Sequence, residues 1–511
     1  MIGAGSAGCV VARRLVDAGL DVLLLEAGPA DEHPAIHDPL RMFELWAGEG
    51  GLDWGYASVP QANLGGRTIQ HTRGRVLGGS SSVNGMYHVR GLRADFDTWA
   101  YLGNEGWRYD DLLPLFKRAE SYDRGGDEER GGEGPLAVLS DYEPHPLSAA
   151  MMAAAEAAGH AANPNYNRGD HDGVSLIQLD AKDGERHNAA RAFVHPVAES
   201  PNFTVRTGCQ VQRLLFEGNR CVGVELLRDG AVEQVRTSGE VVLSAGVFDS
   251  PKLLMLSGIG PAAELAGLGI DPLVDLPGVG RNLQDHVFSP LVHAAAQPIP
   301  APGEGVPAFH AQMFFRSRPG LVGPDLQSLF GPMPHIPEGF EGPEEGFTFT
   351  SMLNRPASRG TVTLASPDPA AAPLIDPNYA SCEADLEAIA SGLEQLREVA
   401  AQGVLDEWRG AELFPGEAVR SRAELREFVR QTLSTIYHPV GTCKMGVDAL
   451  AVVDPQLRVR GVEGLRVADA AVMPTITSGN THVPSVTIGE RAADNVGTAL
   501  GAAAPREAMI S

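Results

Sequence analysis

The first eight residues carry the feature that most restricts the fold of this chain. Gly3, Gly5 and Gly8 form a Gly-x-Gly-x-x-Gly turn at the start of a helix, and Glu26 ends the apolar run LDVLLL that follows. In such a turn the first glycine allows a tight bend, the second lets the backbone approach a pyrophosphate, and the third lets the helix pack on the strand. The helix N-terminus stabilises the phosphate charge. The pattern predicts a dinucleotide site on a doubly wound α/β fold.

Glu26 selects among the dinucleotides. A carboxylate at the end of the second strand accepts hydrogen bonds from ribose hydroxyls and repels a 2′-phosphate, so FAD or NAD is favoured over NADP. The sequence contains no second Gly-x-Gly-x-x-Gly motif. If the cofactor is FAD, we therefore expect its oxidant to come from outside the protein.

The strand that feeds this turn is short. Only Met1 and Ile2 precede Gly3, whereas a strand usually has about five residues. Because this strand lies at the centre of a doubly wound sheet, we expect the native N-terminus to lie further upstream. Mass spectrometry of the protein made from its own locus tests this expectation, and a mature chain that starts at Met1 would count against it.

Composition limits the partners of the chain. Its 511 residues, 43% of them hydrophobic, suffice for two or three domains, and the formal net charge of -25 disfavours nucleic acid or an anionic membrane surface as a partner. No apolar run reaches the length of about 20 residues that a membrane span needs, so we expect a cytoplasmic location.

The five cysteines form no Cys-x-x-Cys motif. His33 and His37 have a proline between them, and no third metal ligand is apparent. We expect no disulfide framework and no metal site.

Hydrophobic periodicity predicts the other elements. Apolar residues at helical spacing predict helices within 106–120, 146–160, 386–402 and 421–433, and alternation predicts strands within 202–230 and 239–246. Proline and glycine are dense between residues 289 and 346. That density predicts loops that cover a substrate region rather than regular packed elements.

Eight further motifs are spread along the chain. They are RGRVLGGSSSVNGMYHVRG from Arg73, SAGVFDSPKLLMLSGIG from Ser244, LPGVGRNLQDH from Leu276, SRGTVTLASPDP from Ser358, IDPNY from Ile375, YHPVGTCKMG from Tyr437, GLRVADAAVMP from Gly464 and TSGNTHVPSVTIGERAAD from Thr477. With the glycine turn they run in order over nearly the whole chain. Together they resemble the motifs of the glucose-methanol-choline (GMC) oxidoreductases, and most closely those of the choline dehydrogenase-like branch, so the chain is identified as similar to this family.

The resemblance implies an α/β fold, α+β overall, with two domains. A Rossmann-like FAD-binding domain is expected from residues 1–135, 186–288 and 432–500. A substrate-binding domain, built on an antiparallel sheet with helices, is expected from 136–185 and 289–431. Residues 501–511 are expected to form a disordered tail.

The resemblance also implies FAD-dependent oxidation of an alcohol (a CH–OH donor) to the aldehyde or ketone. Hydride would pass to flavin N5, and an external acceptor, oxygen or a quinone-type carrier, would reoxidise the flavin. His438 matches the catalytic histidine, a base of near-neutral pKa that takes the hydroxyl proton. Asn480 matches the second active-site position, where an amide N–H can donate to the substrate oxygen. Tyr437 matches an aromatic position that faces the substrate or serves packing.

Several alternatives remain open at this point. The motifs do not separate an alcohol oxidase from an alcohol dehydrogenase, and a hydroxynitrile-lyase-type protein would keep FAD with no net redox chemistry. An inactive FAD-binding scaffold is a further alternative, disfavoured because His438 and Asn480 are both present. The sequence contains no recognisable cage for a cationic substrate, so a quaternary ammonium alcohol such as choline stays an open but unsupported alternative, and a primary alcohol of aliphatic or aryl type is the broader expectation.

The family pattern assigns further residues to the cofactor. Val83 stands where relatives that bind FAD covalently carry histidine, and a valine cannot form that link, so we expect non-covalent FAD. His482 is expected in a loop near the flavin, without a catalytic role. The cofactor-binding residues are expected to be Gly3, Gly5, Ser6, Ala7, Gly8, Glu26, Ala27, Val76, Gly79, Asn84, Gly85, Val211, Ala245, Asp469, Ala470, Asn480 and Thr481.

Overall fold

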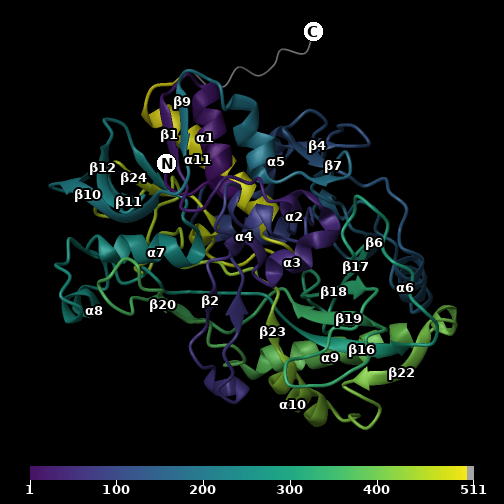
Figure 1. Cartoon of the computed structure of the whole chain (residues 1–511). Helices are drawn as coiled ribbons and strands as arrows, with labels where there is room; N and C mark the ends of the chain where they lie inside the picture. Colours follow the sequence, from purple (N-terminus) through teal and green to yellow (C-terminus); the bar gives the residue numbers. More distant parts are fainter. Residues whose placement is uncertain (503–511) are drawn as a thin grey trace.

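The computed structural model describes residues 1–502, so the predicted tail, 501–511, lies outside the described residues except for its first two. Figure 1 shows two regions. The upper one contains parallel strands with helices α1 (Ser6–Asp17) and α11 (His482–Ala499). The lower one contains an antiparallel sheet with α9 (Glu383–Ala400) and α10 (Arg422–Thr432). The mixed α and β architecture with an antiparallel sheet confirms the predicted fold class.

The parallel strands come from four distant parts of the chain. They are β1 (Val22–Leu25), which pairs with β9 (Phe203–Arg206), and β13 (Val241–Leu243), which pairs with β24 (Leu465–Val467). Ile2 joins the two pairs, because it bridges β1 at Leu25 and β13 at Leu243 in parallel. Its N–H donates to the Val242 carbonyl at 2.9 Å, and its carbonyl accepts from the Ser244 N–H at 2.7 Å. The segment before the glycine turn thus holds the central place in this sheet.

The glycine turn is packed too tightly for side chains. Gly3 has φ +88°, and a Cβ atom there would collide with the Ser244 carbonyl. A Cβ atom on Gly8 would collide with the Gly3 carbonyl. Helix α1 can therefore approach the turn and the β13 strand end closely only because both positions are glycine.

The antiparallel sheet has seven strands. Along its main path they are β22 (Arg409–Phe414), β16 (Val287–Ala295), β19 (Gly346–Leu353), β18 (Leu326–Gly331), β17 (Ala311–Phe315) and β6 (Gly173–Leu176), and β23 (Ser434–Thr435) pairs with β16. Strand β19 shows how its two faces differ. Phe347 and Phe349 belong to the core that includes α9 and α10, whereas Thr348 and Thr350 between them line a cavity on the other face.

The prediction of loops between residues 289 and 346 was wrong. This region contains most of β16, all of β17 and β18, and the start of β19. All residues of β17 and β18 are buried, so these strands lack the alternation that marks a half-exposed strand. The proline and glycine residues lie mainly in the connections between them. The predicted domain boundary at residue 288 falls within β16.

The other predicted elements are present. Helices α5 (Tyr109–Ala119), α6 (Pro146–Ala157), α9 and α10 lie within or close to their predicted ranges, as do strands β9, β10 (Gln210–Glu217), β11 (Arg220–Arg228) and β13. The remaining helices are α2 (Pro34–His37), α3 (Met42–Trp46), α4 (Arg93–Tyr101), α7 (Gly246–Leu256) and α8 (Ala262–Gly267). The remaining strands are β2 (Tyr56–Ala57), β3 (Gln70–His71), β4 (Glu120–Tyr122), β5 (Leu136–Val138), β7 (Ala181–Lys182), β8 (Glu185–Arg186), β12 (Ala231–Arg236), β14 (Ile259–Gly260), β15 (Val274–Asp275), β20 (Thr361–Thr363) and β21 (Leu374–Asp376).

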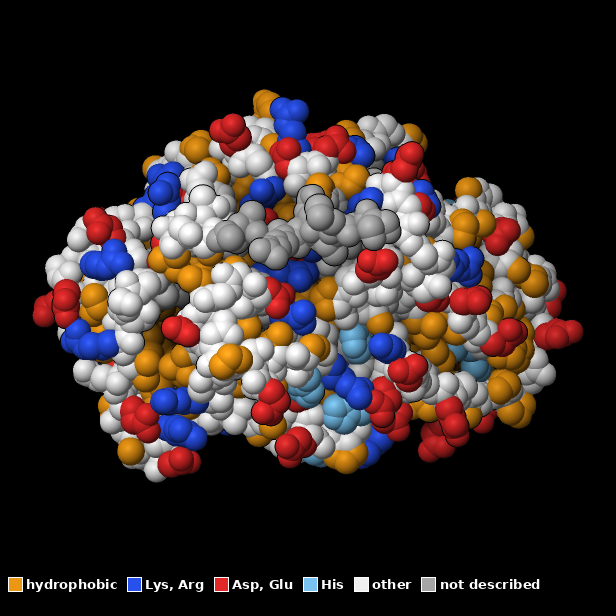
Figure 2. All heavy atoms as spheres, turned by 90° about the horizontal axis from the view of Figure 1, so that it is seen from above, with side chains coloured by type: hydrophobic (Ala, Val, Ile, Leu, Met, Phe, Trp, Pro, Cys, Tyr) orange, Lys and Arg blue, Asp and Glu red, His pale blue; other side chains and the backbone are white. Residues whose placement is uncertain are grey.

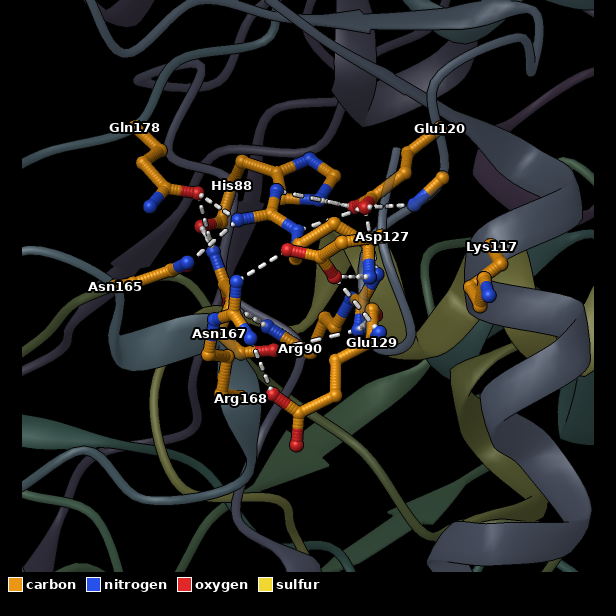
Figure 3. Close-up of polar contacts among 12 residues, drawn as sticks. His88, Arg90, Lys117, Glu120, Asp127, Glu129, Asn165, Asn167, Arg168 and Gln178 are labelled. Carbon is orange, nitrogen blue, oxygen red and sulfur yellow. Dashed lines mark hydrogen bonds and ion pairs between the residues drawn. The ribbon is translucent and has the colours of Figure 1, made fainter. Parts of the chain in front are cut away.

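A buried ion cluster ties together segments from the two predicted domains (Figure 3). Glu120, which is 1% exposed, accepts from Arg90 at 2.6 Å, from Arg130 at 2.8 Å and from His88 Nε2 at 3.0 Å. The other nitrogen of His88 lies 2.7 Å from Asp180. Burial acts to raise the pKa of Glu120, but Arg90, the hydrogen bond from His88 and Arg130 outweigh it and hold that pKa well below its ordinary value.

The surface carries charges of both signs. On the face drawn in Figure 2, acidic and basic side chains are interspersed. No helix within residues 1–502 combines the length and apolarity required to cross a bilayer. The same stretch holds no group of three or more His, Cys, Asp or Glu side chains arranged to bind a metal ion.

Candidate active site

A cavity of about 620 Å³ lies between the glycine turn and the antiparallel sheet. It brings together most of the predicted site residues, namely His438, Gly3, Gly5, Ser6, Ala7, Glu26, Ala27, Gly79, Asn84, Gly85, Val211, Ala245, Asp469, Ala470, Asn480 and Thr481. Gly8 and Val76 are not in its wall. Gly8 lies behind the turn, and Val76 packs in a small apolar cluster with Ala35 and Ile36.

Two helices begin at this cavity. Helix α1 starts at Ser6 and α11 at His482, and neither has a side chain that caps its N-terminal N–H groups. The Ser6 hydroxyl and His482 Nδ1 are 2.8 Å apart, which holds the two helix starts together. His482 is thus the buried first residue of α11 and not the loop residue that the sequence suggested. Uncapped helix N-termini with free N–H groups stabilise bound anions.

The backbone next to the helix starts leaves room for a ligand only because of glycine. A Cβ atom on Gly79 would lie 2.7 Å from the Gly5 Cα. Together with the two helix N-termini, this glycine cradle fits the pyrophosphate of a dinucleotide such as FAD. Val83 lines the same cavity, and its carbonyl accepts from the Trp46 indole N–H at 2.7 Å.

Two carboxylates at the dinucleotide end are fixed by backbone groups. Glu26 accepts from the Ala4 N–H at 2.9 Å and from the Gly28 N–H at 2.8 Å, and burial raises its pKa. Asp469 accepts from the Gly246 N–H at 2.9 Å and from the Ser250 hydroxyl at 2.6 Å, and burial raises its pKa too. These bonds shape the loops that surround the cofactor end of the cavity.

The loop that carries His438 is held in an unusual conformation. Tyr437 has φ +66°, its N–H donates to the Thr435 hydroxyl at 2.8 Å, and its carbonyl accepts from Arg73 at 2.5 Å. Asp285 anchors the same loop, because it accepts from the His438 N–H at 2.9 Å and from the Thr435 hydroxyl at 2.6 Å. Burial raises the pKa of Asp285 to about 6.

The hydrogen bonds around His438 fix its tautomer. His286 Nε2 lies 3.0 Å from the Asn354 carbonyl, which can only accept, so this nitrogen carries the proton. Burial lowers the pKa of His286 to about 3, so the ring is neutral and its Nδ1 is an acceptor. That Nδ1 lies 3.0 Å from His438 Nδ1, which must therefore donate. The lone pair of His438 is left on Nε2.

His438 Nε2 faces the cavity beside Asn480. The Asn480 amide nitrogen lies 3.1 Å from it, consistent with a donor facing an acceptor, and Asn480 Oδ1 is buried without a partner among the described residues. Burial first, then His286 and Arg73, lower the pKa of His438 well below its ordinary value. At neutral pH His438 is thus an unprotonated base whose accepting nitrogen adjoins an amide donor.

The sequence indicated His438 and Asn480 but not the residues that orient them. Asp285 and His286 stand in LPGVGRNLQDH, a motif that was recognised without a role for either side chain. Nothing in the spacing of that motif indicates that its last two residues pack against a loop about 150 residues later. The register of β16 against β23 and the antiparallel bridge between Gln284 and Val440 bring them together.

A variant of His286 tests the tautomer. We expect His286→Leu in the FAD-loaded protein to lower the rate of flavin reduction about 10- to 100-fold, because His438 then loses the acceptor that keeps its proton on Nδ1. His286→Asn places an amide oxygen near the position of the lost Nδ1, so part of the rate should return. Stopped-flow spectroscopy measures both variants, and a leucine variant with the unaltered rate would contradict the assignment.

Comparisons with known proteins agree with this geometry. A family model described as "GMC oxidoreductase" matches residues 1–288, and its C-terminal counterpart matches residues 356–489. The chain is 41% identical over 522 residues to an oxygen-dependent choline dehydrogenase of Sinorhizobium fredii, covering 97% of this chain and 94% of that protein. A choline dehydrogenase of the same description from Sinorhizobium medicae is 42% identical over 523 residues, with the same coverage.

Solved structures are similar over the same length. Pyridoxine 4-oxidase from Mesorbium loti superposes with a TM-score of 0.91 at 35% identity, covering 96% of this chain and 97% of that one. Formate oxidase superposes with a TM-score of 0.89 at 28% identity, covering 98% and 97%. Both similarities extend across the cofactor side and the sheet side of the cavity.

Proposed function

The chain belongs to the GMC oxidoreductase family, and from that membership we propose that it catalyses the FAD-dependent oxidation of an alcohol to the aldehyde or ketone. The observation that carries the proposal is the pair His438 Nε2 and Asn480 Nδ2, 3.1 Å apart in the wall of the cavity that contains the glycine cradle. A base and an oxygen-binding donor at one point are what proton removal from a hydroxyl requires.

In this proposal His438 Nε2 takes the hydroxyl proton. His438 Nδ1 keeps its own proton and continues to donate it to His286 Nδ1, so the His438 ring becomes a cation without changing its orientation. The substrate hydroxyl would replace the Asn480 amide as the donor to His438 Nε2, and the amide would then donate to the substrate oxygen and stabilise the negative charge that develops there. Bound FAD would supply the acceptor for the hydride that leaves the carbon.

The FAD itself would be held by the glycine cradle and the two helix N-termini. We propose non-covalent binding, because Val83 lines the cavity where a covalent relative would carry histidine and has no atom able to form the link. We also propose a division into an FAD-binding domain (1–135, 186–288 and 432–500) and a substrate-binding domain (136–185 and 289–431), with the boundary at residue 288 moved to the start of β16 at Val287, and a cytoplasmic location.

The electron acceptor is proposed to be external. Oxygen is favoured over a quinone-type carrier by the description of the Sinorhizobium relatives as oxygen-dependent and by the similarity to pyridoxine 4-oxidase. A lyase reaction would use the same histidine without reducing FAD, and no feature of the described cavity favours it.

Anaerobic titration of the purified yellow protein with primary alcohols tests the proposal. We expect at least one alcohol to bleach the oxidised flavin band, because proton removal by His438 leaves the carbon ready to give up its hydride. Readmission of air should restore the band with release of hydrogen peroxide if oxygen is the acceptor. If the flavin stays oxidised with every alcohol and the protein cleaves a cyanohydrin, the proposal is contradicted and the lyase reaction is favoured.

A further inference from the structure

We propose that the alcohol accepted by this cavity is a neutral primary alcohol attached to an aromatic or heteroaromatic ring, and that a quaternary ammonium alcohol is excluded. This inference rests on the proposed function and adds to it the chemistry of the substrate. It follows from three properties of the cavity near His438, namely its aromatic lining, the positions of its charges, and one polar side chain.

Aromatic side chains line the cavity in a continuous run that ends beside the base. The rings of Phe309 and Phe43 lie 6.3 Å apart, Phe43 and Trp46 lie 5.3 Å apart at 86°, and Trp46 and Tyr437 lie 5.9 Å apart. Tyr437 precedes His438. Aromatic rings gain from edge-to-face and offset contacts with another ring, so this run favours a substrate that brings one.

The sheet provides the opposite part of the lining. Phe288 of β16, Leu329 of β18 and Thr350 of β19 face the cavity, and the connection after β18 adds Met333 and Pro334. The Thr350 hydroxyl already accepts from the Leu329 N–H at 2.8 Å. This wall therefore offers mainly apolar contact to the part of the substrate that does not react.

The charges of the cavity do not suit a cationic substrate. The carboxylates in its lining are Glu26, Asp249 and Asp469. Glu26 and Asp469 are bonded to the backbone of the cofactor loops, and Asp249 accepts from Tyr56 at 2.6 Å and lies 3.9 Å from Lys252. None of the three belongs to the sheet wall. A quaternary ammonium group there would lack a counter-charge and would cost the free energy of leaving water.

Among the charged groups beside the base, Asp285 is buried and absent from the cavity lining, whereas Arg73, which lines the cavity, is positive. Arg73 lines the cavity and donates to the carbonyl of Tyr437, the residue before His438. Aromatic faces attract quaternary ammonium groups, but a guanidinium at the same end of the cavity opposes that attraction. A neutral ring keeps the aromatic contacts and avoids the repulsion.

His335 adds one polar position to the apolar wall. Its ring contacts Phe288 edge-to-face at 5.1 Å, and its imidazole is exposed in the cavity without a hydrogen-bond partner among the described residues. The backbone N–H of His335 is fixed by the Thr348 hydroxyl at 2.8 Å. An imidazole at this place can donate to or accept from a ring nitrogen or a phenolic hydroxyl, so His335 is assigned as a specificity-determining residue.

Anaerobic flavin reduction of the holoenzyme by four alcohols tests the substrate class. The probes are benzyl alcohol, pyridin-4-ylmethanol, butan-1-ol and choline. We expect the ratio of limiting reduction rate to Kd to be about 100-fold higher for the two ring-bearing alcohols than for choline, and higher than for butan-1-ol. Choline or butan-1-ol that reduces the flavin as efficiently as benzyl alcohol overturns the inference.

A binding measurement separates this inference from the proposed reaction. Toluene and tetramethylammonium cannot be oxidised here as alcohols, and each can be titrated while the visible flavin spectrum is recorded. We expect toluene to perturb the spectrum with saturation and tetramethylammonium to leave it unchanged. If tetramethylammonium perturbs the spectrum and toluene does not, the inference is overturned even if an alcohol reduces the flavin. If toluene binds but no alcohol reduces the flavin, the result counts only against the proposed function.

The role of His335 is tested by His335→Phe. This change keeps a ring against Phe288 and removes the polar edge, so Kd for pyridin-4-ylmethanol should rise about 10-fold while Kd for benzyl alcohol stays the same. The matched control is His293→Phe, since His293 stacks on Phe347 at 5.5 Å and does not line the cavity. If the Kd values for both alcohols change equally, or if neither changes, the role assigned to His335 is overturned.

Discussion

Replacing His438 with glutamine is expected to slow flavin reduction by alcohol about 10²- to 10⁴-fold, the range that a positioned general base contributes. The glutamine side chain can still form hydrogen bonds at this position, but it cannot take the hydroxyl proton at neutral pH. Because His438 Nε2 lies 3.1 Å from the Asn480 amide, the loss falls on the step that starts at the bound oxygen. Stopped-flow reduction under anaerobic conditions measures it.

The control for this experiment is the flavin itself. His438 is not part of the glycine cradle, so the variant should remain yellow and keep the oxidised flavin spectrum. His293→Gln provides a matched histidine replacement in the antiparallel sheet, outside the cavity, and should reduce at the unaltered rate. A His438→Gln variant with full FAD and an undiminished rate would remove His438 from the mechanism.

Replacing Glu120 with glutamine is expected to lower the free energy of unfolding by about 3–5 kcal/mol, the cost of breaking a buried ion pair from one side. Arg90 and Arg130 are both fully buried and would lose the negative charge of Glu120 that balances their guanidinium groups. Urea unfolding, followed by tryptophan fluorescence, measures the change. Glu128→Gln is the matched control, because Glu128 is exposed on the loop that carries Arg130 and its loss should cost less than about 0.5 kcal/mol.

The same cluster predicts the direction of a pH effect. The pKa of Glu120 is held below its unfolded value, so its contribution to stability is complete above the ordinary glutamate pKa of about 4.3 and is lost as the pH falls through the folded value. Unfolding midpoints recorded between pH 7 and pH 3 should therefore fall less steeply for Glu120→Gln than for the unaltered protein. Parallel curves would contradict the assigned charge state.

The sequence was most informative where local geometry needs a particular residue. Gly3 and Gly8 could be interpreted alone, because no side chain fits beside the Ser244 and Gly3 carbonyls. His438 and Asn480 could be named because their motifs resemble a known family, although the separation of their side chains could not be foreseen.

The sequence was least informative where burial or long-range packing determines the secondary structure and the neighbours of a residue. Strands β17 and β18 are buried on both faces, so they carry no alternation that would have marked them among the prolines. The pairing of His286 with His438 depends on β16 meeting β23, a contact that no local pattern encodes. His482 was placed in a loop although Thr481, a residue type that favours helix N-caps, precedes it, and in the structure the Thr481 hydroxyl makes no cap hydrogen bond.

The two faces of β19 have a consequence for how such proteins diversify. Phe347 and Phe349 hold the strand to the helices behind it, while Thr350, on the alternate face, borders the space for the reacting molecule. A mutation at position 350 that keeps a hydroxyl for the Leu329 N–H, such as Thr350→Ser, can therefore change the substrate space without loosening the sheet. Adjacent codons therefore encode a contact with the scaffold core and a contact with the substrate space, so selection can change the substrate preference and leave the scaffold unaltered.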